Sequence, residues 1–401
     1  MNKRLYIISI VAFLVYQFVN FVYFPLHTLY PDESRFIGEA IKFAKSGEFW
    51  MGTSRAWEMP LTGIFYGFLY KIFNSEELLI ISVRIIQSLL LIINAFLVYK
   101  IALIIFKDKT VSFVSFFVVL FYPFFIYYQG LLLSETIFIS ILLFGFYYTY
   151  KWYESYFEIN RYFFLANFFL VFSIYSKATM TILPPFLLAT FAFLNKKDFG
   201  SVLKIFFFSF FAWMVLMSPW WIRNYTIFDR FVPFTTSSGA NLYLGNNSFN
   251  KNGGCDWSKD VDLSLVKSIK KLPELEQNKR FKEEAIKFIY ENPNRFIKLM
   301  WLKLKRFYNV QFNNENLRKS FLNIISILSY GTVFVLFLVS IVLNLKEWRK
   351  LSAIYILFLY FTLIHTIIIA SLRYRLPLEP FMILMASCSF VYLTKFIKKI
   401  K

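Results

Sequence analysis

Adjacent carboxylates follow the first hydrophobic segment, within residues 30–50, YPDESRFIGEAIKFAKSGEFW. Asp32 and Glu33 shortly precede Arg35, at the point where a membrane-spanning helix would end and water would begin. Acidic side chains are costly beside lipid, so carboxylates at a membrane boundary need a reason. One interpretation is structural, with Asp32 capping the first turn of a surface helix that lies on the headgroups. The other is chemical, because a carboxylate in such a position can act as a general base.

Charged side chains in later segments favour the chemical interpretation. They lie where hydrophobic runs would reach one side of a membrane: Arg84, Glu135 in LSETIF, Lys177, Arg223 and Asn224 in WWIRNY, and Arg373 and Arg375 in RYRLP. Two acids and several arginines at one depth predict a polar cavity in which carboxylates and guanidinium groups offset one another. In such a cavity a carboxylate can take a proton from a hydroxyl while arginines hold a phosphate leaving group.

Each of these residues also has a structural alternative. Arg84 could extend its guanidinium to the headgroups, and Glu135 could stabilise the start of a helix through the helix dipole. Arg223 could be an interfacial anchor beside Trp220 and Trp221. The arginines of RYRLP could pair with lipid phosphates in general. The chemical interpretation therefore depends on the whole set meeting in one place.

The composition excludes an ordinary soluble domain of this length. Hydrophobic residues make up 58% of the chain, aromatic residues 22% and charged residues 17%. The net charge of +20 would suggest nucleic-acid binding in a soluble protein, but here lysine and arginine mostly separate hydrophobic runs. We therefore expect an integral membrane protein with no nucleic-acid partner, in the class of all-α polytopic proteins.

About ten hydrophobic runs are long enough to cross a membrane, with nine to twelve as the range. They are residues 5–24, 78–106, 111–128, 134–150, 162–175, 180–194, 202–221, 321–345, 351–371 and 378–396. Residues 61–73 are too short to cross and predict an interfacial or re-entrant helix, like the amphipathic run in residues 30–50. The first run resembles a signal peptide but lacks a small-residue cleavage pattern, so we interpret it as an uncleaved anchor.

Lysine and arginine in the short loops predict the orientation, because such residues concentrate on the cytoplasmic side. Most of them fall in alternate loops, such as those at Lys107 and Lys109, Lys196 and Lys197, and the C-terminal Lys398 and Lys399. We expect a multi-pass protein of the plasma (cytoplasmic) membrane with both termini in the cytoplasm. The candidate site residues would then face outward.

The chain divides into three expected parts. Residues 1–221 form a transmembrane catalytic module with a first outer loop at 25–77, residues 222–319 form an extracytoplasmic loop, and residues 320–401 form the last transmembrane helices. Within the long loop, residues 272–290 and 293–308 have helical patterns. The second alternates apolar residues with Arg295, Lys298, Lys303, Lys305 and Arg306, which predicts a basic amphipathic helix on the outer leaflet.

Metal and disulfide signals are weak. Cys255 lies in a polar loop and Cys388 in a hydrophobic run, so the two do not suggest a disulfide or a cysteine metal site. His27 and His365 are isolated in the sequence. We expect no metal and no cofactor, although two carboxylates could still bind a divalent cation.

The ordered set of motifs resembles the GT-C membrane glycosyltransferases that use polyprenyl-phosphate sugars, including protein O-mannosyltransferases and the aminoarabinose transferases of lipid A. The resemblance covers nearly the full chain: DESRF at 32–36, VRIIQSLL around Arg84, LSETIF with Glu135, PWWIRNYTIFDRFVPFTTSSGANLYLGNN at 219–247 and RYRLPLEPF at 373–381. It implies that Asp32 is the catalytic acid residue of the first loop and that Glu135 assists catalysis by positioning the acceptor or the sugar. Arg84 and Arg223 would hold the site or the lipid phosphate.

The chain departs from this family at three points. Some relatives have a phosphate-binding lysine before a Pro-Pro-Leu run, where this chain has WEMPL with Glu58 and Met59, so Lys177 or Arg55 would have to supply that contact. The second acid is Glu135 where many relatives have aspartate. After about ten helices we expect no appended soluble domain of the kind that some relatives carry, which leaves the acceptor open.

We therefore expect an inverting glycosyltransferase of the cell envelope, a hexosyl- or pentosyltransferase. It would move a sugar from a polyprenyl-phosphate donor to a hydroxyl of a glycolipid, polysaccharide or protein on the outer face, with Asp32 as general base. Glu33, Arg35, Lys177, Arg223, Asn224, Arg373 and Arg375 would bind substrate, as would Arg84. The alternative is a transporter or lipid flippase with a charged outer vestibule. The sequence shows no inverted repeat, which weighs against that alternative.

Overall fold

The computed structural model describes residues 3–49 and 54–400, and every regular element within these ranges is helical. The predicted ends of the chain, residues 1, 2 and 401, and residues 50–53 of the predicted first outer loop lie outside the described residues. The prediction of an all-α polytopic membrane protein is confirmed.

Six helical segments of the described chain are long and apolar enough to cross a membrane, or seven if one bent pair is counted as a span. The six are α1 (Lys3–Tyr23), α4 (Glu76–Phe106), α10 (Phe199–Phe228), Phe321–Leu343, Leu345–Ile367 and Leu372–Ile400. The bent pair is α5 (Lys109–Leu120) with α6 (Pro123–Gln129), at 47°. The predicted count of ten is not confirmed.

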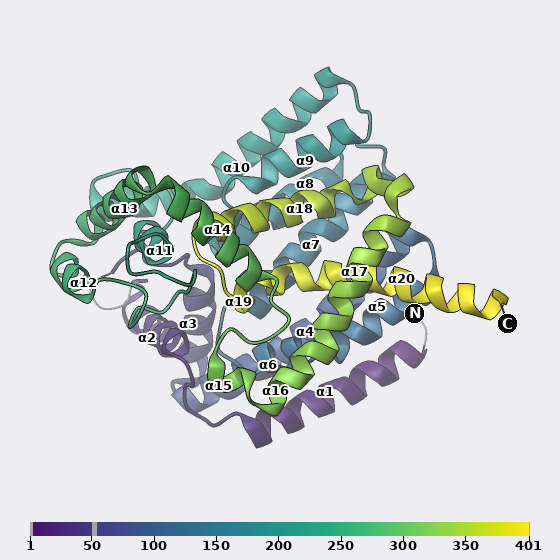
Figure 1. The fold of residues 1–401 in the computed structure, drawn as a ribbon, viewed down its shortest axis with the longest axis horizontal. Helices are drawn as coiled ribbons and strands as arrows, with labels where there is room; N and C mark the ends of the chain where they lie inside the picture. The colour runs from purple at the N-terminus through teal and green to yellow at the C-terminus, as the bar shows by residue number, and fades with distance from the viewer. Residues whose placement is uncertain (1–2, 50–53, 401) are drawn as a thin grey trace.

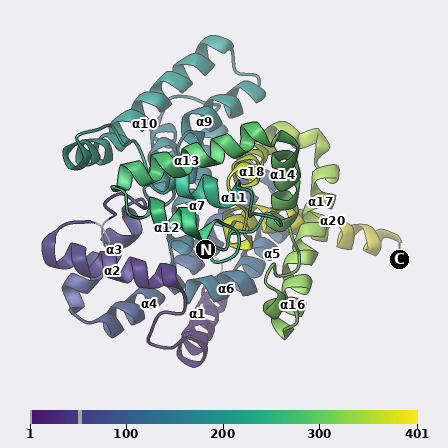
Figure 2. The same ribbon diagram turned by 60° about the vertical axis from the view of Figure 1, so that its left-hand side comes forward.

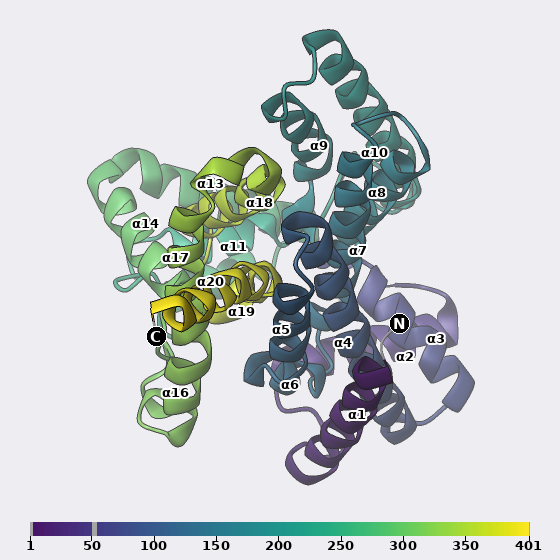
Figure 3. The same ribbon diagram turned by 90° about the vertical axis from the view of Figure 1, so that its right-hand side faces the viewer.

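The remaining runs predicted to cross the membrane are also helices. They are α7 (Glu135–Glu154), α8 (Arg161–Phe172) with a short 3₁₀ turn at Ser173–Tyr175, and α9 (Leu183–Leu194). The last three spans contain α16 (Phe321–Ser326), a π-helical turn at Ile327–Gly331, α17 (Thr332–Leu343), α18 (Trp348–Ile367), α19 (Leu372–Arg375) and α20 (Glu379–Ile400). Figure 3 shows α20 between α17 and α5, and it packs against both.

The two short amphipathic helices of the first loop pack on each other. α2 spans Pro31–Ser46 and ends at Gly47, whose φ of 72° suits glycine. α3 spans Leu61–Phe73, the range that the sequence predicts. Phe36, Ile37 and Ala40 of α2 are buried with Tyr66 of α3. This packing fixes the direction of the first turn of α2, where Asp32 lies.

The long polar stretch folds into short helices: α11 (Ser238–Gly245), α12 (Leu263–Ile269), α13 (Glu274–Glu291), α14 (Pro293–Phe307) and α15 (Glu315–Arg318). The two helices predicted at 272–290 and 293–308 correspond to α13 and α14. The structure differs at one residue of the predicted basic face, because Lys303 is buried where α14 packs on α18. Its ammonium group instead hydrogen-bonds to the end of α18.

The elements separate toward two ends of the molecule. In Figure 1, α2, α3 and α11 to α13 gather at the left, whereas the start of α1 and the end of α20 lie toward the right. Figure 2, which brings the left side forward, shows α11, α12 and α13 near α2 and α3. The first outer loop and the long loop, far apart in the sequence, therefore share one end of the helical bundle.

Candidate active site

Glu33 organises the start of α2. Its carboxylate accepts hydrogen bonds from the backbone N–H groups of Leu29 (2.8 Å) and Tyr30 (2.9 Å) through Oε2, and from Leu132 (2.9 Å) through Oε1. The side chain is fully buried. Because Leu132 lies just before Glu135, Glu33 ties the start of α2 to the segment that leads into α7. It thereby fixes the distance between Asp32 at the start of α2 and Glu135 at the start of α7.

Asp32 is the more open of the two adjacent acids, with 35% of its side-chain surface exposed. Its Oδ1 accepts a hydrogen bond from Arg35 at 2.9 Å, and its Oδ2 forms an ion pair with Arg373. Burial raises the pKa of Asp32, but the positive charges of Arg373 and Arg35 outweigh it and hold the pKa below its ordinary value. Asp32 is therefore an ionised carboxylate at neutral pH.

Arg373 joins Asp32 to Glu135. Its Nε donates to Glu135 Oε1 at 2.6 Å and its Nη2 to Glu135 Oε2 at 3.2 Å, so the guanidinium holds this carboxylate with two parallel bonds. Lys177 donates to the same Oε1 at 2.7 Å. Only 1% of the Glu135 side chain is exposed, so two cations offset its charge in a buried site.

The segment that carries Arg373 is held by the long loop. Lys303 Nζ donates to the carbonyl oxygens of Ile367 (2.8 Å) and Ile368 (3.1 Å), at the end of α18. Gly245 lies so close that a Cβ there would stand 1.8 Å from the Ile368 oxygen, so only glycine fits. Burial lowers the pKa of Lys303 to about 7. The loop thus fixes the turn that leads to α19 and its arginines.

Two further acids lie beside this cluster, and the sequence analysis did not assign them to the site. Glu58 forms an ion pair with Arg35, and Glu39 is buried one helical turn beyond Arg35 on α2. Burial raises the pKa of Glu58, although Arg35 opposes the shift. Burial and the charge of Glu58 raise the pKa of Glu39 to about 8. The spacing of Asp32, Arg35 and Glu39 on one helical face was the signal that could have revealed Glu39.

Other predicted site residues do not touch the carboxylates of Asp32 or Glu135. Arg84 donates to the carbonyl oxygens of Gly130 (2.9 Å), Phe24 (3.2 Å) and Pro25 (2.9 Å), which joins the end of α1 to the segment before α7.

Arg223 and Asn224 form a separate group at the end of α10. Arg223 donates to the Phe49 carbonyl at 2.6 Å and to Asn224 Oδ1 at 2.8 Å, and its guanidinium lies 4.7 Å from the Trp220 ring centre. Asn224 in turn donates to the Val232 carbonyl at 2.8 Å. This group connects the end of α2 to the beginning of the long loop.

Arg375 points into a second polar group that is sealed from solvent. Its Nε donates to Glu379 at 2.7 Å and its Nη1 to the Asn309 carbonyl at 2.8 Å, and its guanidinium lies 3.3 Å from the Tyr330 ring centre. Arg375 and Glu379 are both fully buried. The two arginines of RYRLP therefore belong to different clusters.

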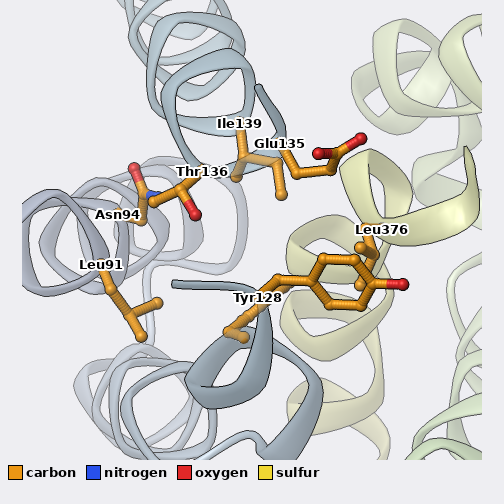
Figure 4. Close-up of a pocket in the computed structure, with 8 residues that line it drawn as sticks. Leu91, Asn94, Tyr128, Glu135, Thr136, Ile139 and Leu376 are labelled. Carbon is orange, nitrogen blue, oxygen red and sulfur yellow. The ribbon is translucent and has the colours of Figure 1, made fainter. Parts of the chain in front are cut away.

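A small pocket lies beside Glu135. Figure 4 shows the Glu135 carboxylate turned away from Leu91 and Asn94, on the same side as the hydroxyl of Tyr128. Thr136, Ile139 and Leu376 also line this pocket. Leu91, Ile139 and Leu376 contribute apolar atoms beside Glu135, and such surroundings strengthen the pairing of a carboxylate with its cations.

The described residues contain no group of three or more histidine, cysteine, aspartate or glutamate side chains that could hold a metal ion. Asp32 and Glu135 both direct their oxygens at Arg373. A guanidinium therefore bridges the two carboxylates in this structure.

A family model and several solved structures resemble this chain. Residues 58–222 match the model of dolichyl-phosphate-mannose-protein mannosyltransferases. A search of the curated proteins found none that matches.

The fold is similar to that of an archaeal oligosaccharyltransferase. AglB from Archaeoglobus fulgidus, in complex with an inhibitory peptide and a dolichol-phosphate, aligns with a TM-score of 0.56 at 10% identity over 100% of this chain and 52% of that one. The oligosaccharyltransferase of the same organism in the apo form gives 0.54 at 11% identity, over 98% and 51%. This chain thus spans about half the length of these proteins. ArnT from Cupriavidus metallidurans bound to undecaprenyl phosphate gives a lower TM-score of 0.47 at 13% identity, over 96% and 78%. The chain therefore shares the fold of this archaeal oligosaccharyltransferase, and residues 58–222 resemble the mannosyltransferase family.

Proposed function

We propose that the chain transfers a sugar from a polyprenyl-phosphate donor to a hydroxyl group of an acceptor, with Asp32 as general base. The observation that carries this proposal is the bridge from Asp32 through Arg373 to Glu135, since it joins a partly exposed carboxylate to cations suited to a phosphate. The match to a family of dolichyl-phosphate-mannose users supports the class of donor. So does the dolichol-phosphate in complex with the structurally similar AglB.

The reaction is a single displacement. The acceptor oxygen attacks the anomeric carbon of the sugar, and the bond between that carbon and the phosphate oxygen breaks. The electron pair of that bond leaves with the polyprenyl phosphate, and the acceptor proton passes to Asp32. A single attack from the opposite face inverts the anomeric configuration. Arg373 and Arg35 stabilise the negative charge that grows on the leaving phosphate.

Donor binding also adjusts the basicity of Asp32. In this structure both oxygens of Asp32 are paired with arginines, which favours the ionised form and makes it a weak base. A phosphate that shares Arg35 and Arg373 draws positive charge away from Asp32. The carboxylate then becomes a stronger base at the step when a proton must be accepted. Proton transfer by a positioned carboxylate contributes roughly 10²- to 10⁴-fold to a rate.

The remaining candidate residues take two kinds of role in this proposal. Glu135 and Lys177 assist by positioning the acceptor or sugar next to Asp32, through the shared contact with Arg373. Glu33, Arg84, Arg223, Asn224 and Arg375 are positioning residues, because each bonds to backbone groups or to buried partners. Their substitution acts on the site through the loops they hold.

The site faces outward in this proposal, and both termini lie in the cytoplasm. Lysine and arginine are in excess in alternate short loops, and such residues concentrate on the cytoplasmic side of a membrane. Polyprenyl-phosphate sugars then reach the site from the outer leaflet, and the acceptor is a glycolipid, a polysaccharide or a protein of the cell envelope.

A transporter or lipid flippase remains the competing function. A transport route needs polar groups along the depth of the membrane. The ion pairs of the site instead join the first turns of α2 and α7 to the short helix α19. Release of polyprenyl phosphate with a glycosylated acceptor separates the two functions, since a flippase returns its lipid unchanged.

Mass spectrometry of cell-envelope glycans and lipids tests the proposal. Cells that lack the chain are compared with the same cells carrying either the wild-type chain or Asp32→Asn. We expect one glycosylated product to disappear, to return with the wild-type chain and to stay absent with Asp32→Asn expressed at the same level. Return of the product with Asp32→Asn would refute the role of Asp32 as general base.

A further inference from the structure

Arg35 is shared between two acids. It donates to Asp32 at 2.9 Å and forms an ion pair with Glu58, which comes from the segment between α2 and α3. About a fifth of the Arg35 side chain and a quarter of the Glu58 side chain are exposed, at 20% and 24%. The pair therefore borders the open part of the site, where a ligand can compete for it.

The long loop fixes the backbone that presents Glu58. Glu274 accepts hydrogen bonds from the N–H groups of Arg55 (2.6 Å) and Ala56 (3.0 Å), and the Thr236 N–H donates to the Ala56 carbonyl at 2.8 Å. Met59, next to Glu58, is buried. These hydrogen bonds hold the backbone beside Glu58 in place. They therefore fix the position from which the Glu58 carboxylate reaches Arg35.

Arg35 has binding capacity that its acidic partners leave unused. Its Nε is buried and finds no hydrogen-bond partner among the residues that the structure describes. A guanidinium fork binds a phosphate with two parallel hydrogen bonds, one of which can come from Nε. An anion that replaced Glu58 would accept a hydrogen bond from Arg35 Nε as well as from Nη2, the nitrogen that Glu58 now contacts.

A neighbouring side chain can receive Glu58 once it is displaced. Glu39 is 2% exposed, and its Oε2 lacks a partner within the described part of the chain. Burial and, to a lesser extent, the charge of Glu58 raise the pKa of Glu39 to about 8, so Glu39 is protonated at neutral pH. A protonated carboxyl can donate a hydrogen bond to a carboxylate that has lost its arginine.

We propose that Glu58 occupies the anion-binding position of Arg35 and that the phosphate of the polyprenyl-phosphate donor displaces it. This inference rests on the proposed function. It adds that Glu58, a residue of the chain itself, competes with the donor phosphate for Arg35. The competitor keeps Arg35 oriented and its charge offset until a donor arrives. It also weakens the binding of any phosphate, including the product polyprenyl phosphate, which favours product release.

The test measures the affinity of purified protein in nanodiscs for a labelled polyprenyl phosphate. We expect Glu58→Gln to bind about fivefold more tightly than the wild type, the amount corresponding to loss of one partly exposed ion pair. Glu48→Gln removes an acid from the same loop at an exposed position, so it controls for net charge and should match the wild type. The same lipid without its phosphate should bind both variants equally.

A double-mutant cycle separates competition from a general structural effect. In an Arg35→Gln background, Glu58→Gln should no longer tighten binding, since the position for which it competes is gone. If Glu58→Gln unfolds, Glu58→Asp serves in its place, with about a twofold gain because the shorter side chain reaches Arg35 less well.

The outcomes distinguish the inference from the proposed function. Tighter binding by Glu58→Gln that depends on Arg35 and on the lipid phosphate supports the inference. Equal or weaker binding by both Glu58 variants, with the wild type still binding the lipid phosphate, overturns it and leaves the function standing. Failure of the folded wild type to bind any polyprenyl phosphate overturns both.

Discussion

Arg373 and Arg375 lie two residues apart and serve different regions of the molecule. Arg373 is 22% exposed and joins Asp32 of α2 to Glu135 of α7, in a cluster that reaches solvent. Arg375 is fully buried with Glu379, one helical turn away, and with backbone carbonyls. The first region holds excess cationic hydrogen-bond donors near an open carboxylate. The second is closed around its own charges.

The surroundings of each arginine therefore indicate whether it stabilises the fold or is available to a ligand. A buried ion pair costs desolvation free energy and is strongly disrupted when one partner is lost. A partly exposed pair contributes little to stability and can exchange its partner for a ligand. We therefore expect substitutions around Arg373 to reduce activity while the protein stays folded. Substitutions around Arg375 should lower the free energy of unfolding.

The largest expected effect is on Asp32, at the open end of the first region. Asp32→Asn removes the proton acceptor and should lower the transfer rate about a thousandfold. The thermal unfolding temperature should stay close to that of the wild type, because this carboxylate is partly exposed. Sugar transfer from a polyprenyl-phosphate donor by purified protein measures the rate. A variant with wild-type activity would remove Asp32 from the chemistry.

The second-largest expected effect is on the buried pair of Arg375 and Glu379. Arg375→Leu leaves Glu379 charged and buried without its partner, which should lower the free energy of unfolding by about 3 kcal/mol. Thermal unfolding in detergent, followed by size-exclusion chromatography, measures the loss. The double variant Arg375→Leu, Glu379→Leu should recover most of the stability. If Arg375→Leu is as stable as the wild type, the buried pair of Arg375 and Glu379 does not stabilise the fold.

Arg373→Lys tests the open side with a conservative change. Lysine keeps the charge but cannot hold Glu135 with two parallel bonds while contacting Asp32. We expect about a hundredfold lower kcat, on the scale of losing a donor to a developing oxyanion. The unfolding temperature should change little. A large loss of stability with unchanged kcat would reverse the assignment of the two arginines.

The smallest effect is a pH dependence of stability at Glu39, which borders the open region. Its pKa is raised from 4.5 to about 8 in the folded protein, so the folded state holds a proton that the unfolded state releases. The contribution of Glu39 to stability is therefore largest below pH 4.5 and falls as pH rises toward 8. Glu39→Gln should remove this fall and exceed the wild type by about 1 kcal/mol at pH 8.5.

Unfolding temperatures of the wild type and Glu39→Gln between pH 5 and 8.5 measure this difference. Glu48→Gln, at an exposed position of the same loop, should follow the wild type across the range. A constant difference between Glu39→Gln and the wild type would show that Glu39 does not titrate in this range.

Helices were the most predictable part of the fold, because hydrophobic runs and amphipathic periodicity are local properties. The range predicted for α3 and the end of α2 at Gly47 agree with the structure. The structure also brings Asp32, Glu135 and Arg373 into contact, and the loop charges predicted the same side of a membrane for their three segments.

Partners within the site could not be predicted in the same way. Arg84 and Arg223 bond mainly to backbone carbonyls, which every residue offers, so residue types gave no signal for these contacts. Lys303 has the charge pattern of an exposed helix face, yet packing of α14 on α18 buries it. The pairing of Arg35 with Glu58 depends on how the long loop holds residues 54–60, which no local pattern encodes.

The most direct test of the central claim is an experimental structure of the protein with a polyprenyl phosphate bound. The account predicts the phosphate within hydrogen-bonding distance of Arg373 and Arg35, with Asp32 beside it and Arg375 still paired with Glu379. A phosphate bound away from this cluster, with Arg373 still held between Asp32 and Glu135, would contradict it.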